Sequence, residues 1–225
     1  MALLEIEDLA KTFYTPEHTV SAQIYLPELS LEEGEALVLD GPSGSGKTTV
    51  LHMISGLLSP DSGKIVFNGC HVSAMSEKKR AVWRAANIGY IFQRLNLLEE
   101  LTVLENVLLP LCWRGDKSEK REITRLAKVL LEHVGLKEKM DSFPRQLSIG
   151  EQQRAAVVRA MVYKPKLILA DEPTASLDVA NGGKVLDLLQ ELCRDYGAAL
   201  LLCTHDEGVK ARFSYRYNLR SGSYE

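Results

Sequence analysis

The sequence predicts an α/β fold with a mainly parallel sheet core, a separate sheet near the N-terminus and an inserted helical region. Short apolar runs alternate with amphipathic stretches along most of the chain, which is the pattern of parallel sheets with crossover helices. A glycine-rich turn separates one apolar run from the helix after it. The chain has 225 residues, 45% hydrophobic and 25% charged, so it can bury a core without disulfides.

The N-terminal part is predicted to consist mostly of strands. Mixed alternation of apolar and polar residues predicts the start of a sheet at Leu3–Leu9. We also expect Leu26, Leu29 and Leu31 to be core residues. The dipeptide Asn68-Gly69 is typical of a turn and closes one strand. We expect strands at residues 35–40, 64–67 and 88–92, a helix at 47–57, and a solvated basic helix face at Glu77-Lys78-Lys79-Arg80.

The middle of the chain is predicted to be helical. Thr102 and Glu105 have the spacing of a capping box, and Pro110 ends the helix that follows. Apolar residues from Ile123 to Val134 recur at helical spacing, and Gly135 is a C-terminal cap. This region, from about residue 72 to 140 and on through a helix at 151–163, is read as an inserted helical subdomain. Buried strands at 167–170 and 199–202, with a helix at 178–195 between them, complete the core.

Charge and cysteine content exclude several classes of protein. The net charge of −3 argues against a protein whose main function is to bind nucleic acid through its phosphates, so no nucleic-acid partner is expected. No two cysteines have a Cys-x-x-Cys spacing, which disfavours a zinc ribbon or a redox pair and fits a reducing compartment. The N-terminus lacks the features of a signal peptide, and no apolar run is long enough to span a bilayer.

One loop matches the P-loop pattern for phosphate binding in full. It lies between a predicted strand and a predicted helix, as the pattern requires. Its glycines let backbone N–H groups turn toward phosphate oxygens, and the helix adds the positive end of its dipole. Lys47 would reach the β- and γ-phosphates, and the Thr48 hydroxyl would bind Mg²⁺. A chance match in a surface loop is the alternative, which the strand–loop–helix context disfavours. The motif is Gly41-Pro42-Ser43-Gly44-Ser45-Gly46-Lys47-Thr48, and Thr49 follows it.

Two carboxylates follow the apolar strand Leu167–Ala170. Ligands of open α/β sheets bind at the carboxyl ends of strands, where Asp171 and Glu172 stand. Asp171 would hold Mg²⁺, and Glu172 would act as general base toward the attacking water. The alternative is a simple strand-to-loop exit, which the P-loop upstream makes the weaker interpretation.

The segment between these two sites resembles the signature sequence of the ATP-binding-cassette (ABC) family. It reads Leu147-Ser148-Ile149-Gly150-Glu151-Gln152-Gln153-Arg154. The resemblance covers nearly the whole chain and implies a P-loop NTPase of the ABC ATPase fold, 1–225 being one nucleotide-binding domain with an antiparallel N-terminal β subdomain. It also implies roles for further residues: Gln93 as a catalytic and Mg²⁺-binding glutamine, His205 as the switch histidine, Phe13 or Tyr14 as the adenine-stacking ring, and Ala175-Ser176-Leu177-Asp178 as the D-loop.

Three segments, residues 92–98, 101–107 and 109–111, are similar to those of the LolD/MacB group, with the cell-division ATPase FtsE as a close relative. The resemblance implies an ATP-hydrolysing subunit of a bacterial ABC transporter that drives lipoprotein release or export. Such a subunit is expected in the cytoplasm, on the inner face of the membrane through a separate permease. The cofactors implied are ATP and Mg²⁺, and the ATP would lie between two copies arranged head to tail. Ile149 stands where the family usually has glycine.

Other functions remain to be weighed. An FtsE-like ATPase that regulates a membrane or cell-wall machine without moving a substrate is not separated from a transporter by sequence. A soluble ABC ATPase of translation or DNA repair usually has two cassettes or a long coiled coil, and this sequence indicates one cassette and no extended heptads. A non-ABC P-loop kinase is also disfavoured, because it would leave the signature segment unexplained. The side chains of Leu95, Leu97 and Leu98 fit either a partner-binding groove or ordinary core packing.

Overall fold

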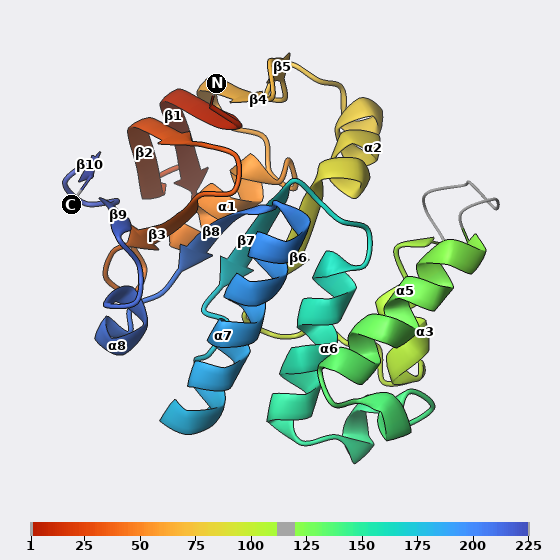
Figure 1. Cartoon of the computed structure of the whole chain (residues 1–225). Helices are drawn as coiled ribbons and strands as arrows, with labels where there is room; N and C mark the ends of the chain where they lie inside the picture. The colour runs from red at the N-terminus through yellow and green to blue at the C-terminus, as the bar shows by residue number, and fades with distance from the viewer. Residues whose placement is uncertain (1, 112–119, 225) are drawn as a thin grey trace. The chain divides into compact units, whose positions relative to one another are not determined.

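The computed structural model describes residues 2–111 and 120–224 and divides the chain into two compact units. The first unit comprises Met1–Arg84 and Leu201–Glu225, and the second comprises Ala85–Leu200. Figure 1 colours the chain from its N-terminus to its C-terminus, so that the elements of each unit can be followed by label.

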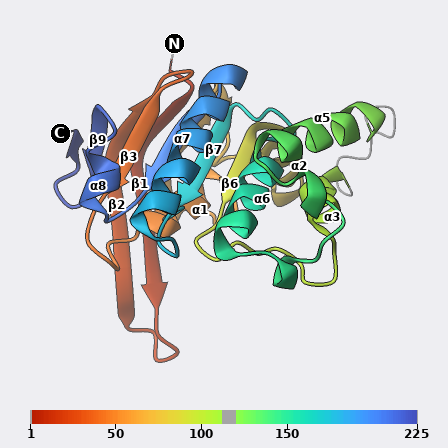
Figure 2. The ribbon, with the colours of Figure 1, turned by 60° about the horizontal axis from the view of Figure 1, so that its bottom comes forward.

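The first unit contains the antiparallel N-terminal sheet that the resemblance implies. Its strands are β1 (Leu4–Tyr14), β2 (Val20–Leu31), β4 (Ser62–Phe67) and β5 (Cys70–His71), in the order β2-β1-β4-β5. Figure 2 shows β1 and β2 as a long hairpin. Leu26, Leu29 and Leu31 are buried, as predicted.

The remaining strands of the first unit surround β3 (Ala36–Asp40). They lie in the order β10-β9-β3-β8, in which β3 pairs in parallel with β9 (Tyr215–Asn218) and β9 in antiparallel with β10 (Ser223–Tyr224). Strand β8 (Ala199–Cys203) crosses the division between the units. Helices α1 (Lys47–Ile54) and α8 (Glu207–Lys210) follow β3 and β8 in the chain.

Two predictions for the first unit need correction. Helix α1 ends at Ile54 rather than Leu57, because Gly56 takes a left-handed backbone with φ +69°. Helix α2 (Glu77–Asn87) does not present Glu77–Arg80 wholly to solvent. Arg80 is 7% exposed, pairs with Glu77, and lies so close to Gly56 that a Cβ there would approach its Cγ to 2.5 Å.

The second unit contains a parallel pair of strands, β6 (Ile88–Ile91) and β7 (Leu167–Asp171), with helix α7 (Val179–Tyr196) following β7. All five residues of β7 are buried, which confirms the predicted core strand. Gly89 is required by close packing, because a Cβ at this position would lie 2.3 Å from the Ala160 carbonyl oxygen.

The middle of the second unit is helical, as predicted. Helices α3 (Val103–Leu108), α5 (Lys120–His133) and α6 (Ile149–Met161) pack beside one another (Figure 1), with 3₁₀ turns η1 (Lys137–Lys139) and η2 (Pro144–Gln146) between α5 and α6. The predicted capping box of Thr102 and Glu105 is present, and Gly135 has φ +73° just after α5. Among the helices that the structure describes, none combines the length and apolar character needed to cross a bilayer.

Candidate functional site

The predicted phosphate loop occupies the turn between β3 and α1. Gly44 and Gly46 have φ values of +78° and +97°, which other residues rarely adopt. A Cβ at Gly46 would lie 2.7 Å from Cγ1 of Ile24, and one at Gly41 would lie 2.6 Å from the Ser45 hydroxyl oxygen. The glycines are therefore required both by the backbone path and by the space around it.

Polar groups of the loop are arranged to receive an anion. The Lys47 ammonium is buried and donates to the carbonyl oxygens of Gly41 at 2.6 Å and Pro42 at 3.1 Å, so one of its three N–H groups remains for a phosphate oxygen. The Ser45 hydroxyl oxygen is buried and has no hydrogen-bond partner among the described residues. Such an atom is costly unless a ligand satisfies it.

Helix α1 begins without a capping side chain or an acidic residue in its first turn. Its first backbone N–H groups and the positive end of its dipole are thus available to an anion. Thr48 lies in this first turn and is exposed. The donors, the orphaned hydroxyl and the uncapped helix together fit the phosphates of a nucleotide.

The predicted adenine-stacking residues stand at the end of β1, next to the hairpin turn. The strand register shifts between Phe13 and Tyr14. Tyr14 is 61% exposed, whereas Phe13 is half-buried. The Tyr14 ring therefore offers the larger free face for stacking on a base.

The loop with His205 connects β8 to α8 in the first unit. Next to the exposed His205, Asp206 caps α8, since its Oδ1 accepts the backbone N–H groups of Gly208 at 2.7 Å and Val209 at 3.3 Å. Buried Thr204 supports the loop by accepting the Asp206 backbone N–H at 3.1 Å. Lys210, which the sequence did not single out, pairs with Asp40 at 2.6 Å beside the phosphate loop.

In the second unit, β7 ends at Asp171, which is 4% exposed. Glu172 follows with φ +46°, a left-handed conformation that costs about 1–3 kcal/mol for a residue other than glycine. Strained backbone of this kind is concentrated at functional sites, where the surrounding structure maintains it. This geometry agrees with a special role for the residue.

The D-loop leads directly into α7. Asp178 caps this helix by accepting the Asn181 backbone N–H at 2.9 Å, and that bond keeps the pKa of Asp178 below its usual value. Val179, the first helical residue, is 94% exposed. A Cβ at Gly150 would lie 3.9 Å from Cδ2 of Leu177, so the structure brings the signature and the D-loop together within the second unit.

The signature sequence forms the start of α6, but the helix begins two residues earlier than predicted, at Ile149. Ser148 is its N-cap: the Ser148 hydroxyl accepts the Glu151 backbone N–H at 3.3 Å and donates to the Glu151 carboxylate at 2.9 Å. Hydrogen bonds from Ser148 lower the pKa of Glu151. Ile149 is 53% exposed, and Leu147 is buried.

Gln93 is exposed and follows β6 in a loop whose backbone is held by two side chains, half-buried Arg159 and buried Asn106. Arg159 of α6 donates to the carbonyl oxygens of Leu95 at 2.6 Å and Asn96 at 2.7 Å, and burial lowers its pKa to about 10. Asn106 is fully buried and exchanges hydrogen bonds with the backbone of Leu98 at 2.7 and 3.0 Å. Sequence analysis missed both residues, although a lone asparagine in an apolar helix is a recognisable signal.

The leucines of this loop are not core residues. Leu98 is 43% exposed, and Leu95 and Leu97 are half-buried. Of the two interpretations left open by the sequence, this exposure favours the partner-binding surface.

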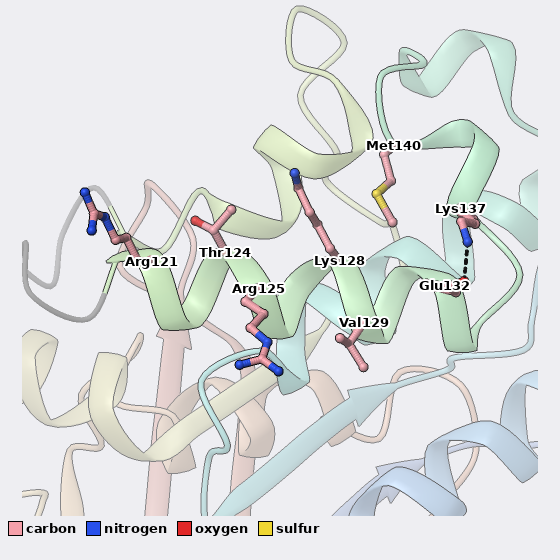
Figure 3. A pocket seen from close by; sticks show the side chains of 8 residues that line it. All are labelled: Arg121, Thr124, Arg125, Lys128, Val129, Glu132, Lys137 and Met140. Carbon is pink, nitrogen blue, oxygen red and sulfur yellow. Dashed lines mark hydrogen bonds and ion pairs between the residues drawn. The ribbon is translucent and has the colours of Figure 1, made fainter.

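A surface pocket of about 500 Å³ lies along α5 and contains none of the predicted site residues. Figure 3 shows its basic side chains, among them Arg121, Arg125 and Lys128, and the ion pair between Lys137 and Glu132. No cluster of three or more His, Cys, Asp or Glu side chains suited to a metal occurs in the described part of the chain.

Comparison with known proteins shows the family of this chain. The family model described as ABC transporter matches residues 27–175. The chain belongs to the ABC transporter family. It is an ATP-binding and ATP-hydrolysing subunit with the ABC ATPase fold, and the resemblance noted in the sequence is confirmed.

Two similar proteins are named as lipoprotein-releasing system ATP-binding protein LolD. The one from Syntrophus aciditrophicus (strain SB) is 40% identical over 220 residues, which cover 98% of this chain and 97% of that protein. The one from Shewanella denitrificans (strain OS217) is 39% identical over 221 residues, covering 98% and 93%.

Two similar solved structures are dimers of the ATP-binding cassette MJ0796. One is a post-hydrolysis state bound to ADP and Pi, with a TM-score of 0.82, 32% identity, and coverage of 99% of this chain and 97% of that one. The other, described as a bacterial ABC transporter cassette, has a TM-score of 0.82, 33% identity and coverage of 96% and 93%.

Proposed function

We propose that this chain is the ATPase of a bacterial lipoprotein-releasing transporter and works through a separate membrane permease. The observation that supports this best is the 40% identity to a LolD protein over 98% of this chain. Exposed Leu98, together with half-buried Leu95 and Leu97 of the Gln93 loop, supplies a surface for the permease, on the inner face of the membrane. Residues 1–225 act as one nucleotide-binding domain, with a helical subdomain from about residue 72 to 163.

The phosphate loop binds the nucleotide, and the second unit contributes the catalytic carboxylate. Residues 41–49 hold the phosphates, Lys47 neutralises them, and Tyr14 or Phe13 stacks on the adenine. Glu172 holds the attacking water and accepts its proton, while His205 contacts the γ-phosphate. Thr48, Gln93 and Asp171 would hold Mg²⁺, which would supply positive charge to the phosphate oxygens.

Two copies of the chain close on ATP head to tail. The residues Leu147–Glu151 of one copy contact the ATP on the phosphate loop of the other, where the N-terminus of α6 offers backbone N–H groups and a positive dipole. The D-loop residues 175–178 lie beside the signature in the second unit and belong to the same interface. The MJ0796 dimers support this assembly.

The test is the dimeric state of Glu172→Gln, which keeps the size of the side chain but removes the base. With ATP and Mg²⁺ it should hydrolyse ATP at less than about 1% of the wild-type rate. It should also elute as a dimer, because the nucleotide that joins the copies is not cleaved. A Glu138→Gln control, on the exposed turn η1, should behave as wild type. Wild-type turnover in Glu172→Gln, or a monomer saturated with ATP, contradicts the proposal.

The permease and the cargo need a separate measurement. Membrane protein that co-purifies with this chain should release lipoprotein from proteoliposomes in an ATP-dependent way. If the partner moves no lipoprotein and the complex only changes a cell-wall enzyme, the chain is an FtsE-like regulator instead.

A further inference from the structure

An ion pair joins the helix after His205 to Asp40, the residue directly before the phosphate loop, and both partners lie within the first unit. The Lys210 ammonium lies 2.6 Å from Oδ1 of Asp40, and the same oxygen accepts the backbone N–H of Gly41 at 2.6 Å. Asp40 is the last residue of β3 and Lys210 the last of α8. One carboxylate oxygen therefore connects the two segments.

The pair is shielded from water on the lysine side. Lys210 is 6% exposed, and its ammonium also contacts Glu207 at 2.9 Å. Burial by itself lowers the pKa of Lys210, but the hydrogen bonds with Asp40 and Glu207 more than offset this, so the net shift is upward. The side chain thus stays charged. Removing one partner of such a pair leaves the other charge poorly compensated.

Helix α8 is fixed at both of its ends. Asp206, the neighbour of His205, caps the first turn, and Lys210 anchors the last residue to Asp40. The helix has only four residues and cannot hold its own conformation by helix propensity. These two anchors therefore contribute to its position and, together with Thr204, to that of the loop before it.

We propose that Lys210 is a positioning residue for ATP hydrolysis, which holds His205 in register with the phosphate loop through Asp40. This inference rests on the proposed role of His205. Displacing a group that contacts the transferred phosphate by about 1 Å lowers turnover by up to about a hundredfold. Binding of the nucleotide, in contrast, depends on the phosphate loop itself and is retained.

The experiment compares Lys210→Met with Arg80→Met. Arg80 is a matched control, because it is also a buried cation of the first unit, with 7% exposure, and it also pairs with a glutamate three residues earlier. Unlike Lys210, it lies far along the chain from His205. Lys210→Met should lower turnover about tenfold and leave the ATP dissociation constant within about twofold. Arg80→Met should lower the melting temperature by a similar amount and leave turnover within about twofold. Lys210→Arg, which keeps the cation, should recover most of the wild-type turnover.

A second measurement separates positioning from a general structural role. Single-turnover hydrolysis is followed in His205→Ala and in His205→Ala combined with Lys210→Met. If Lys210 acts only through His205, the double variant is no slower than His205→Ala, since effects of residues that act as a unit are not additive.

Three results overturn the proposal: equal losses of turnover in Lys210→Met and Arg80→Met, unchanged turnover in Lys210→Met, or a further large loss in the double variant. Failure of the proposed function gives a different result. In that case His205→Ala itself hydrolyses ATP at the wild-type rate, whatever Lys210→Met does.

Discussion

The Ser148 hydroxyl and the Glu151 carboxylate lie 2.9 Å apart at the start of α6, and each also accepts a backbone N–H of the other residue. This capping box occupies the middle of the signature sequence. The residues expected to face the nucleotide of a second copy are therefore also the residues that start the helix.

The capping box predicts a pH-dependent contribution to stability. The pKa of Glu151 lies below its usual value of 4.5, so the carboxylate stabilises the fold above that pH, and the gain is lost as the pH falls through the folded-state pKa. Urea unfolding of wild type and Glu151→Gln should differ most at pH 7 and progressively less toward pH 3.5. A difference that is constant with pH, or one equally large for Glu138→Gln, contradicts this assignment.

Loss of the N-cap hydroxyl should destabilise the same helix. Ser148→Ala removes the acceptor for the Glu151 backbone N–H, which costs about 0.5–2 kcal/mol for a typical N-cap. The free energy of unfolding from urea titration measures this cost. Ser148→Thr retains a hydroxyl and should recover most of the lost stability. An unchanged free energy of unfolding in Ser148→Ala would mean that the cap contributes nothing to stability.

Lys47 is expected to contribute mainly to nucleotide affinity. Lys47→Ala removes a charge-assisted hydrogen bond worth about 1.5–3 kcal/mol, so the ATP dissociation constant should rise at least about tenfold. Titration with a fluorescent ATP analogue measures the change. Lys64→Ala, an exposed lysine of the same unit, should bind as wild type. Unchanged affinity in Lys47→Ala would count against the phosphate loop as the binding site.

The two glycines with positive φ in the phosphate loop differ in the space around them. Nothing lies within 4 Å of a Cβ at Gly44, whereas a Cβ at Gly46 would meet three carbon atoms of Ile24. Gly44→Ala should therefore cost about 1 kcal/mol through the backbone alone, and Gly46→Ala more. Thermal unfolding of both variants measures the difference.

Removing the obstructing side chain provides the control. In Ile24→Ala, the added cost of Gly46→Ala should shrink to about that of Gly44→Ala, giving a coupling of about 0.5–3 kcal/mol. Additive effects of the two substitutions would show that Ile24 does not limit the space at Gly46.

A large cation in the signature should prevent closure of the dimer. Ser148→Arg places a guanidinium where the second copy's ATP is expected, and should abolish the ATP-dependent dimer in the Glu172→Gln background. Nucleotide binding to the monomer should stay within about threefold, because Ser148 lies outside the phosphate loop. Size-exclusion chromatography in the presence of ATP measures the dimer, and Glu138→Arg serves as the control. A normal dimer in Ser148→Arg would mean that the signature lies outside the interface.

Local rules predicted the elements of this fold well. The buried strand before Asp171, the capping box of Thr102 and the glycine after α5 each depend on neighbouring residues, so periodicity and capping patterns are sufficient to find them. The start of α6 was predicted two residues late because the spacing of Ser148 to Glu151, which is that of an N-cap, was not used.

Contacts between distant segments could not be predicted in the same way. Nothing near Lys210 in the sequence indicates that it contacts Asp40. The sequence likewise predicts a solvated Arg80, because its packing against Gly56 involves a residue distant in the chain. Sequence analysis found the P-loop, the acidic strand end and the signature because the residues of each one are contiguous in the chain. Their supporting residues are recruited from elsewhere in the chain and become visible only in the folded state.

Arg159 gives α6 a mechanical property. Its guanidinium grips the backbone of Leu95 and Asn96 near one end of this 13-residue helix, and Ser148 caps the other end. At 1.5 Å per residue the helix is a stiff rod about 20 Å long. A displacement of the loop that contains Leu95 and Asn96 would therefore act on the same helix whose first residues form the signature.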